Sequence, residues 1–155
     1  MNNLLSLLTT FTGRISRRQW WIGLVVISVA DIAGGMLINP DYFFADERPP
    51  KSRLDTLWQI ALLVPMTAIT VKRFNDTDHP AWFGYLIPAF GLFGLYVVQH
   101  LREWTNELVL TALFPILLLM CAYALFTFAN NGFVRDTDGP NRYGPDPLAG
   151  APQSA

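Results

Sequence analysis

The chain has 155 residues, of which 52% are hydrophobic and 15% are charged, and its formal net charge is −1. Soluble domains carry roughly 25% charged residues, so this composition argues against an ordinary soluble domain, and the net charge argues against a nucleic-acid partner. The single cysteine, Cys121, excludes an intramolecular disulfide and a multi-cysteine metal cluster.

The first twelve residues contain no charged side chain, and basic residues follow them. This order is the inverse of the one in a cleaved signal peptide, so we expect the first apolar run to be retained. The apolar side chains of this stretch fit one face of a short helix on the inner leaflet, before a turn at Gly13. They are Leu4, Leu5, Leu7, Leu8 and Phe11.

Four apolar runs follow, at residues 20–38, 57–71, 81–98 and 108–129. With a rise of about 1.5 Å per residue they give roughly 22 to 33 Å of helix, against a hydrocarbon core of about 30 Å. The sequence therefore predicts an all-α, polytopic membrane protein with four transmembrane helices. We expect one domain over residues 1–147, with no separate soluble domain, and a disordered tail over residues 148–155.

Local signals refine the runs. Ser16 and Gln19 have the spacing of a capping box, which predicts that the first helix begins near Arg17. Small residues at Gly23, Ala30 and Gly34 predict a face that packs against other helices rather than lipid. The last three runs each contain a central proline, which predicts a kink, at Pro65, Pro88 and Pro115.

The loop at residues 39–56 contains three prolines and four acidic residues, and we expect it to be irregular and solvated. Basic residues near the spans set membrane topology. On one side of a four-span protein lie Arg14, Arg17, Arg18, Lys72, Arg73, Arg135 and Arg142; on the other lie Arg48, Lys51, Arg53 and Arg102. Seven against four predicts that both termini are cytoplasmic.

One ionisable residue lies well inside a run. Asp31 is near 10 Å from the outer end of the first run by helical rise. An intramembrane carboxylate can carry a proton or bind a cation, or it can simply hydrogen-bond a neighbouring helix. The first role would suit a small oligomeric transporter or channel, and both alternatives stay open here.

A second cluster is expected on the cytoplasmic side. Lys72 should extend to the membrane interface, and Arg73 and Asp76 meet on one face if their helix continues for another turn. The segment at residues 139–147 is dense in Gly and Pro, which predicts a specified loop. The candidate binding residues of this composite basic-aromatic surface are Arg14, Arg17, Arg18, Lys72, Arg73, Asp76, Asn141, Arg142 and Tyr143.

Two interpretations of this surface compete. It can bind an anion such as a phospholipid headgroup, or it can reflect positive-inside charge that is balanced by salt bridges. The acidic residues available for such bridges are Asp76, Asp136, Asp138 and Asp146.

Three segments together resemble the family called domain of unknown function 805: residues 11–21, 71–77 and 139–147. The middle segment departs from the family pattern at four positions, Lys72, Asn75, Asp78 and Phe83. The resemblance implies a small four-helix protein of the bacterial inner membrane, and it supplies no activity, cofactor or catalytic residue.

The sequence shows no catalytic constellation, such as paired intramembrane carboxylates or a G-x-S-x-G serine. His79 and His100 fall on opposite sides of the predicted topology, so we assign no metal and no cofactor. The favoured hypothesis is a non-enzymatic scaffold that binds membrane lipids, including anionic headgroups, or a membrane-protein partner or a second copy. The alternative is the transporter or channel that uses Asp31.

Overall fold

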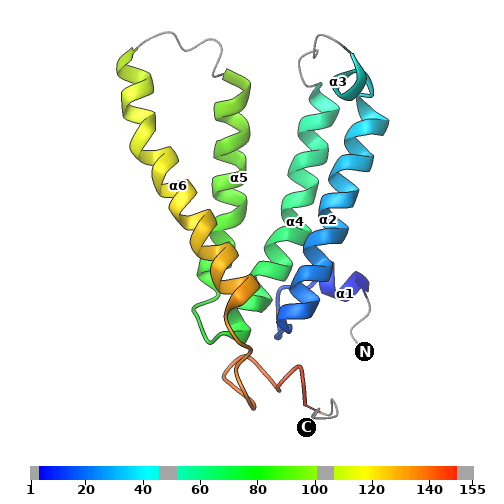
Figure 1. Ribbon diagram of the computed structural model, residues 1–155, viewed down its shortest axis with the longest axis vertical. Coiled ribbons are helices and arrows are strands. Elements are labelled where there is room, and N and C mark those ends of the chain that lie inside the picture. The colour runs from blue at the N-terminus through cyan, green and yellow to red at the C-terminus, as the bar shows by residue number, and fades with distance from the viewer. Residues whose placement is uncertain (1–3, 46–51, 101–106, 150–155) are drawn as a thin grey trace.

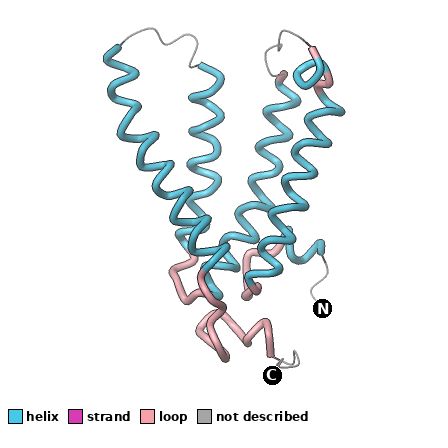
Figure 2. The backbone as a smooth tube through the Cα atoms, viewed as in Figure 1, coloured by secondary structure: helices cyan, strands magenta, loops and turns pink. Residues whose placement is uncertain are grey.

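The computed structural model describes residues 4–45, 52–100 and 107–149, and within them it contains helices and no strand (Figures 1 and 2). Four of the helices are long and apolar enough to cross a membrane: α2, α4, α5 and most of α6. This confirms the predicted all-α, four-span architecture. The helices are α1 (Leu4–Thr9), α2 (Arg17–Ile38), α3 (Asp41–Phe44), α4 (Arg53–Asp76), α5 (Trp82–His100) and α6 (Glu107–Phe133).

Capping boxes set the starts of two spans. Ser16 and Gln19 begin α2 at Arg17, as the sequence predicts. A second capping box begins α4 at Arg53, where the Ser52 hydroxyl accepts from Asp55 and the Asp55 carboxylate accepts from the Ser52 N–H at 2.7 Å. The helix therefore begins before the apolar run at residue 57, because these polar residues belong to its first turn rather than to the loop.

Two helices also extend beyond the ends of their apolar runs. α4 continues five residues past Val71, and every residue from Thr67 to Asp76 is buried. α6 continues past Ala129 to Phe133. In both cases a hydropathy pattern ends where polar residues begin, but these polar residues are helical because they find partners inside the protein.

The outer loop differs from the expectation as well. It contains the short helix α3, so it is not irregular throughout. Residues 46–51 lie outside the described part of the chain, and so does Arg102, which removes Arg48, Lys51 and Arg102 from any structural test of the topology count. Of the predicted tail, Leu148 and Ala149 form a turn, and residues 150–155 lie outside the described residues.

The spans are arranged around α4, which contacts α1, α2, α5 and α6. Two glycines of the predicted small-residue face do pack against α4, Gly23 against Ile69 and Gly34 against the Trp58 ring. Gly84 brings α5 so close to α4 that an added Cβ would lie 2.7 Å from the Val71 Cα. The three prolines lie inside α4, α5 and α6, which continue through them.

Figure 1 shows that the four spans converge at one end and spread apart at the other. We call the first the polar end; it consists of α1, residues 10–17, the last turns of α4, the end of α6 and residues 134–149. Most of the described loop residues lie there (Figure 2). We call the second the open end; it includes α3, the start of α4 and the upper half of α5.

Candidate functional site

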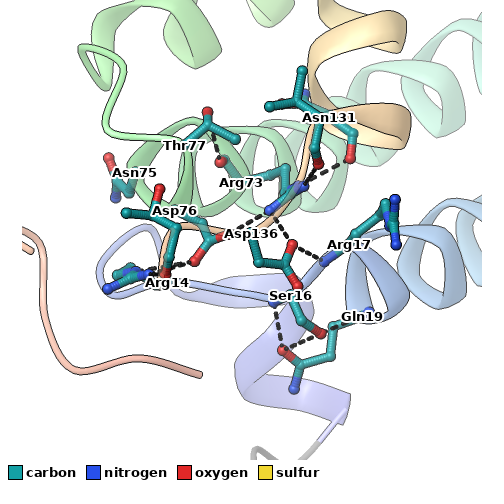
Figure 3. Close-up of polar contacts among 12 residues, drawn as sticks. Arg14, Ser16, Arg17, Gln19, Arg73, Asn75, Asp76, Thr77, Asn131 and Asp136 are labelled. Carbon is teal, nitrogen blue, oxygen red and sulfur yellow. Dashed lines mark hydrogen bonds and ion pairs between the residues drawn. The ribbon is translucent and has the colours of Figure 1, made fainter. Parts of the chain in front are cut away.

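The polar end is organised around one buried carboxylate. Asp76 is fully buried and pairs with two arginines, Arg14 at 2.9 Å and Arg73 on its other oxygen (Figure 3). Arg14 and Arg73 are 5% and 0% exposed. Because α4 continues to Asp76, Arg73 and Asp76 share a helix face, as the sequence predicts for a helix that continues for another turn.

Arg73 joins α4 to the end of α6. Its guanidinium bonds the Asp136 carboxylate at 2.6 Å and donates to the backbone carbonyls of Asn131 at 2.9 Å and Val134 at 2.5 Å. Asp136 in turn accepts from the backbone N–H of Arg17, at the start of α2 (Figure 3). One arginine therefore connects three spans, with its charge shared between two carboxylates.

Arg14 joins the same carboxylate to the chain after α6. Besides Asp76, its guanidinium donates to the backbone carbonyls of Thr137 and Gly139, each at 2.7 Å, and to that of Gly144 at 3.3 Å. Arginine has five N–H donors in a fixed plane, which suits such simultaneous contacts. The residues before α2 and after α6 are thereby held to α4.

Asparagines complete the connection. The Asn75 amide donates to the Gly13 carbonyl at 3.0 Å, and the Asn141 amide donates to the Asn75 carbonyl at 2.9 Å. The turns require positive φ angles, which glycine adopts without strain, at Gly13 (88°) and Gly139 (77°). The predicted specified loop is thus ordered, and it contacts the end of α4.

The sequence predicts that Lys72 extends to the membrane interface, but the structure buries its side chain within the polar end. It is 3% exposed, and its ammonium donates to the backbone carbonyls of Ser6 at 3.0 Å and Leu7 at 2.5 Å. These carbonyls belong to the last turn of α1, where the helix dipole makes a cation favourable. Lys72 therefore attaches the amino-terminal helix to α4.

These contacts correct the predicted surface. Four of its candidate residues are buried in the interior of the polar end: Arg14, Lys72, Arg73 and Asp76. Their contacts match the salt-bridge interpretation, with Asp76 and Asp136 as the acidic partners. A cluster of this kind holds these segments together, and two of its members, Arg14 and Lys72, also line a pocket of about 410 Å³ at the polar end.

The remaining candidates stay accessible. Arg142 is exposed, pairs with Asp78 at 3.1 Å and lies 4.8 Å from the centre of the half-buried Tyr143 ring. Arg17 and Arg18 are exposed at the start of α2 and line a depression of about 430 Å³. Among the described residues, Arg18 has no ion pair or hydrogen bond through its side chain.

Asp146 closes the carboxy-terminal loop. Its carboxylate accepts from the backbone N–H groups of Leu148 at 2.8 Å and Gly139 at 3.0 Å. Both bonds favour the ionised form, so they lower the pKa of the Asp146 carboxyl from its ordinary value.

Asp31 lies far from this cluster, on α2, and its side chain is exposed on the surface of the protein. It lines a cleft of about 510 Å³ between α2, α4 and α5. Within the described part of the chain, no side chain pairs with it.

Sequence reasoning missed two contributors to the polar end, Asn75 and Asn131. Asn131 lies beyond the end of the fourth apolar run at residue 129, but it belongs to α6, is fully buried and accepts from Arg73 through its backbone carbonyl. An asparagine one turn from a helix end carries no sequence signal for burial. Over the described residues, no group of three or more His, Cys, Asp or Glu side chains is arranged to hold a metal.

Comparison with known proteins agrees with the resemblance. The family described as "Protein of unknown function (DUF805)" matches residues 8–145, so the chain belongs to this family. It is also 30% identical over 84 residues to "Inner membrane protein YhaH" of Escherichia coli strain K12, and to the protein of the same name from strain O157:H7. The match covers 52% of this chain and 67% of each relative.

The relatives are inner-membrane proteins, and this chain has four membrane-capable helices. The predicted multi-pass inner-membrane location is therefore confirmed. No solved structure matches the chain.

Proposed function

We propose that this member of the family is a non-enzymatic scaffold of the inner membrane whose polar end binds anionic lipid headgroups at Arg17 and Arg18. The observation that supports this proposal most is that some basic residues of the polar end are buried and others are exposed. Arg14, Lys72 and Arg73 are buried and bonded within the chain, whereas Arg17 and Arg18 are exposed together at the start of a span. An arginine in this position suits a phosphate, which accepts two parallel N–H bonds.

The surface next to these arginines favours a lipid over a soluble anion. Ile22, Val25 and Val29 follow Arg18 by four, seven and eleven residues, so they continue along the same side of α2. Their side chains are 45%, 58% and 60% exposed. A lipid whose headgroup binds Arg18 would therefore have its acyl chain beside these apolar side chains, which continue along α2 from Arg18.

The proposal includes an orientation, with the polar end in the cytoplasm. The described basic residues gather there, and Arg53 is the exception at the open end. Basic residues near spans stay on the cytoplasmic side, where anionic lipids attract them.

Cysteine labelling tests the orientation in a Cys121→Ser background. Asp138→Cys probes the polar end and Asp41→Cys the open end, since both side chains are exposed. A membrane-impermeant maleimide added to sealed, right-side-out cells should label Asp41→Cys, and should label Asp138→Cys only after permeabilisation. The reverse pattern would invert the proposed orientation.

Lipid retention tests the binding itself. Native mass spectrometry of protein purified in a nonionic detergent compares bound phosphatidylglycerol with bound phosphatidylethanolamine. The variant Arg17→Glu/Arg18→Glu should lose the preference for phosphatidylglycerol several-fold. Arg135→Glu is the matched control, because Arg135 is also exposed but lies after α6. Equal preference in the double variant and the wild type would refute the proposal.

This pair of substitutions is preferable to changes at Arg14 or Arg73. Those side chains are buried, so reversing their charge would unfold the polar end and remove lipid binding for an indirect reason. The same spectra report whether copies associate, which tests the predicted homo-oligomer.

A further inference from the structure

The cleft beside Asp31 has an uneven chemical character. Most of its wall is apolar, formed by side chains such as Leu24, Leu63 and Phe90, and its polar side chains belong to the half nearer the open end. The volume of about 510 Å³ is within the range of small-molecule sites. A second apolar pocket of about 340 Å³ shares Leu24, Leu63 and Phe90, so the apolar wall continues toward the polar end.

The polar part of this cleft presents oxygen acceptors. The Asp31 carboxylate has no partner among the described residues, and the Gln59 Oε1 atom is buried without a hydrogen bond. Asp31 and Gln59 also line an adjoining pocket of about 190 Å³, together with Asp55. The Asp55 carboxylate accepts from Asn39 and Ser52.

Among the described residues, no lysine or arginine lines either of these two pockets. The Asp31 carboxylate and an unpaired amide oxygen of Gln59 therefore lie in the same cleft. A buried acceptor without a donor is costly, and an intramembrane carboxylate marks a site for a proton or a cation. An occupant that supplies both a positive charge and N–H donors would satisfy Asp31 and Gln59 at once.

We propose that the cleft between α2, α4 and α5 binds an amphiphilic organic ammonium ion, with its head beside Asp31 and Gln59 and its hydrocarbon part against Leu24, Leu63 and Phe90. The polarity of the cleft selects this class. A metal ion would leave the apolar wall unoccupied, and an anionic amphiphile would place like charges together. The proposal does not rest on the proposed function, which concerns the opposite end of the molecule.

Dodecylammonium is the probe, and dodecanoate is the control with the same chain and the opposite charge. Binding is measured by native mass spectrometry of the full-length protein in a nonionic detergent. The wild type should bind dodecylammonium in preference to dodecanoate. Asp31→Asn should weaken dodecylammonium binding by about tenfold or more, since a charge-assisted hydrogen bond is lost.

Two further variants separate a specific site from general partitioning. Asp41→Asn removes an exposed acid of α3 that does not line the cleft, and it should leave binding unchanged. Gly94→Leu adds a side chain at a residue that lines the cleft, where an added Cβ would make an ordinary contact at 3.7 Å with the Met120 methyl, and we expect it to weaken binding without lowering the unfolding temperature.

Equal binding of dodecylammonium and dodecanoate, or equal affinity of Asp31→Asn and the wild type, would overturn the proposal. Unchanged binding in Gly94→Leu would overturn the position given to the hydrocarbon part. Asp31 has no partner among the described residues, so Asp31→Asn is not expected to unfold the protein.

Discussion

The polar end and the open end of this molecule use charged side chains in opposite ways. At the polar end, the buried Asp76 carboxylate pairs with the buried Arg14 and Arg73, and both arginines also donate to backbone carbonyls. At the open end, Asp31 is exposed to a cleft and has no partner within the described residues. The contrast shows that position near or within a span does not by itself determine the surroundings of a charged residue, because the buried charges have partners in the chain and Asp31 has none among the described residues.

Replacing an aspartate by asparagine at each end should give the largest difference in the free energy of unfolding. Asp76→Asn leaves two buried guanidinium groups without their shared carboxylate, so we expect a loss of roughly 3–5 kcal/mol in the free energy of unfolding. Asp31→Asn removes no contact among the described residues, so it should change the free energy of unfolding by at most about 0.5 kcal/mol. Unfolding in detergent, followed by circular dichroism, measures both. Similar losses would contradict the distinction between the ends.

Helix packing should also differ between the two ends, with a smaller effect on the free energy of unfolding. Gly84→Ala places a Cβ 2.7 Å from the Val71 Cα, where α5 meets α4, so we expect a loss of about 1–3 kcal/mol from overpacking. Gly94→Ala is the control nearer the open end, since its Cβ would make an ordinary contact at 3.7 Å. Thermal unfolding of the two variants measures the difference, and equal midpoints would show that the helices are not closely packed at Gly84.

Exposed ion pairs at the polar end should contribute less to the free energy of unfolding than the Asp76 carboxylate or the packing at Gly84. Arg142 and Asp78 are more than half exposed, so Arg142→Ala should cost less than about 1 kcal/mol. A cost comparable to that of Asp76→Asn, measured in the same unfolding assay, would mean that exposure does not distinguish structural charges from accessible ones.

The smallest expected effect is a pH dependence in the carboxy-terminal loop. The pKa of Asp146 is lowered in the folded chain, so its contribution is complete above the unfolded pKa of about 3.9 and is lost as pH falls through the lower folded pKa. Amide exchange at Gly139 and Leu148, which donate to Asp146, should accelerate in that acidic range, beyond the intrinsic pH dependence of exchange. Asp146→Asn should abolish this dependence, and a dependence that persists in the variant would contradict the assignment.

Much of the fold could be predicted from the sequence, because four apolar runs and a capping box at Ser16 are local signals. The span ends could not, since hydropathy stops where polar residues start. Arg73 and Asp76 are helical because their partners lie on α6 and before α2, and no local pattern records those contacts.

The candidate site could be predicted in part for the same reason. Sequence reasoning grouped Arg14, Arg73 and Asp76 at one end and left open whether they form an accessible surface or internal salt bridges, and the structure shows the salt bridges. Burial of Arg14 depends on carbonyls at residues 137, 139 and 144, which the chain supplies only after it folds back from α6. Lys72 was misjudged likewise, because its partners are the last carbonyls of α1.

The central claim is that a buried ion network holds the polar end together, and a double-mutant cycle tests it most directly. The cycle combines Arg14→Gln with Asp76→Asn and compares it with Arg135→Gln and Asp138→Asn, an exposed pair at 3.5 Å. We predict a coupling energy of about 2 kcal/mol or more for the buried pair and less than about 1 kcal/mol for the exposed pair. A coupling between Arg14 and Asp76 no larger than that of the exposed pair would contradict the claim.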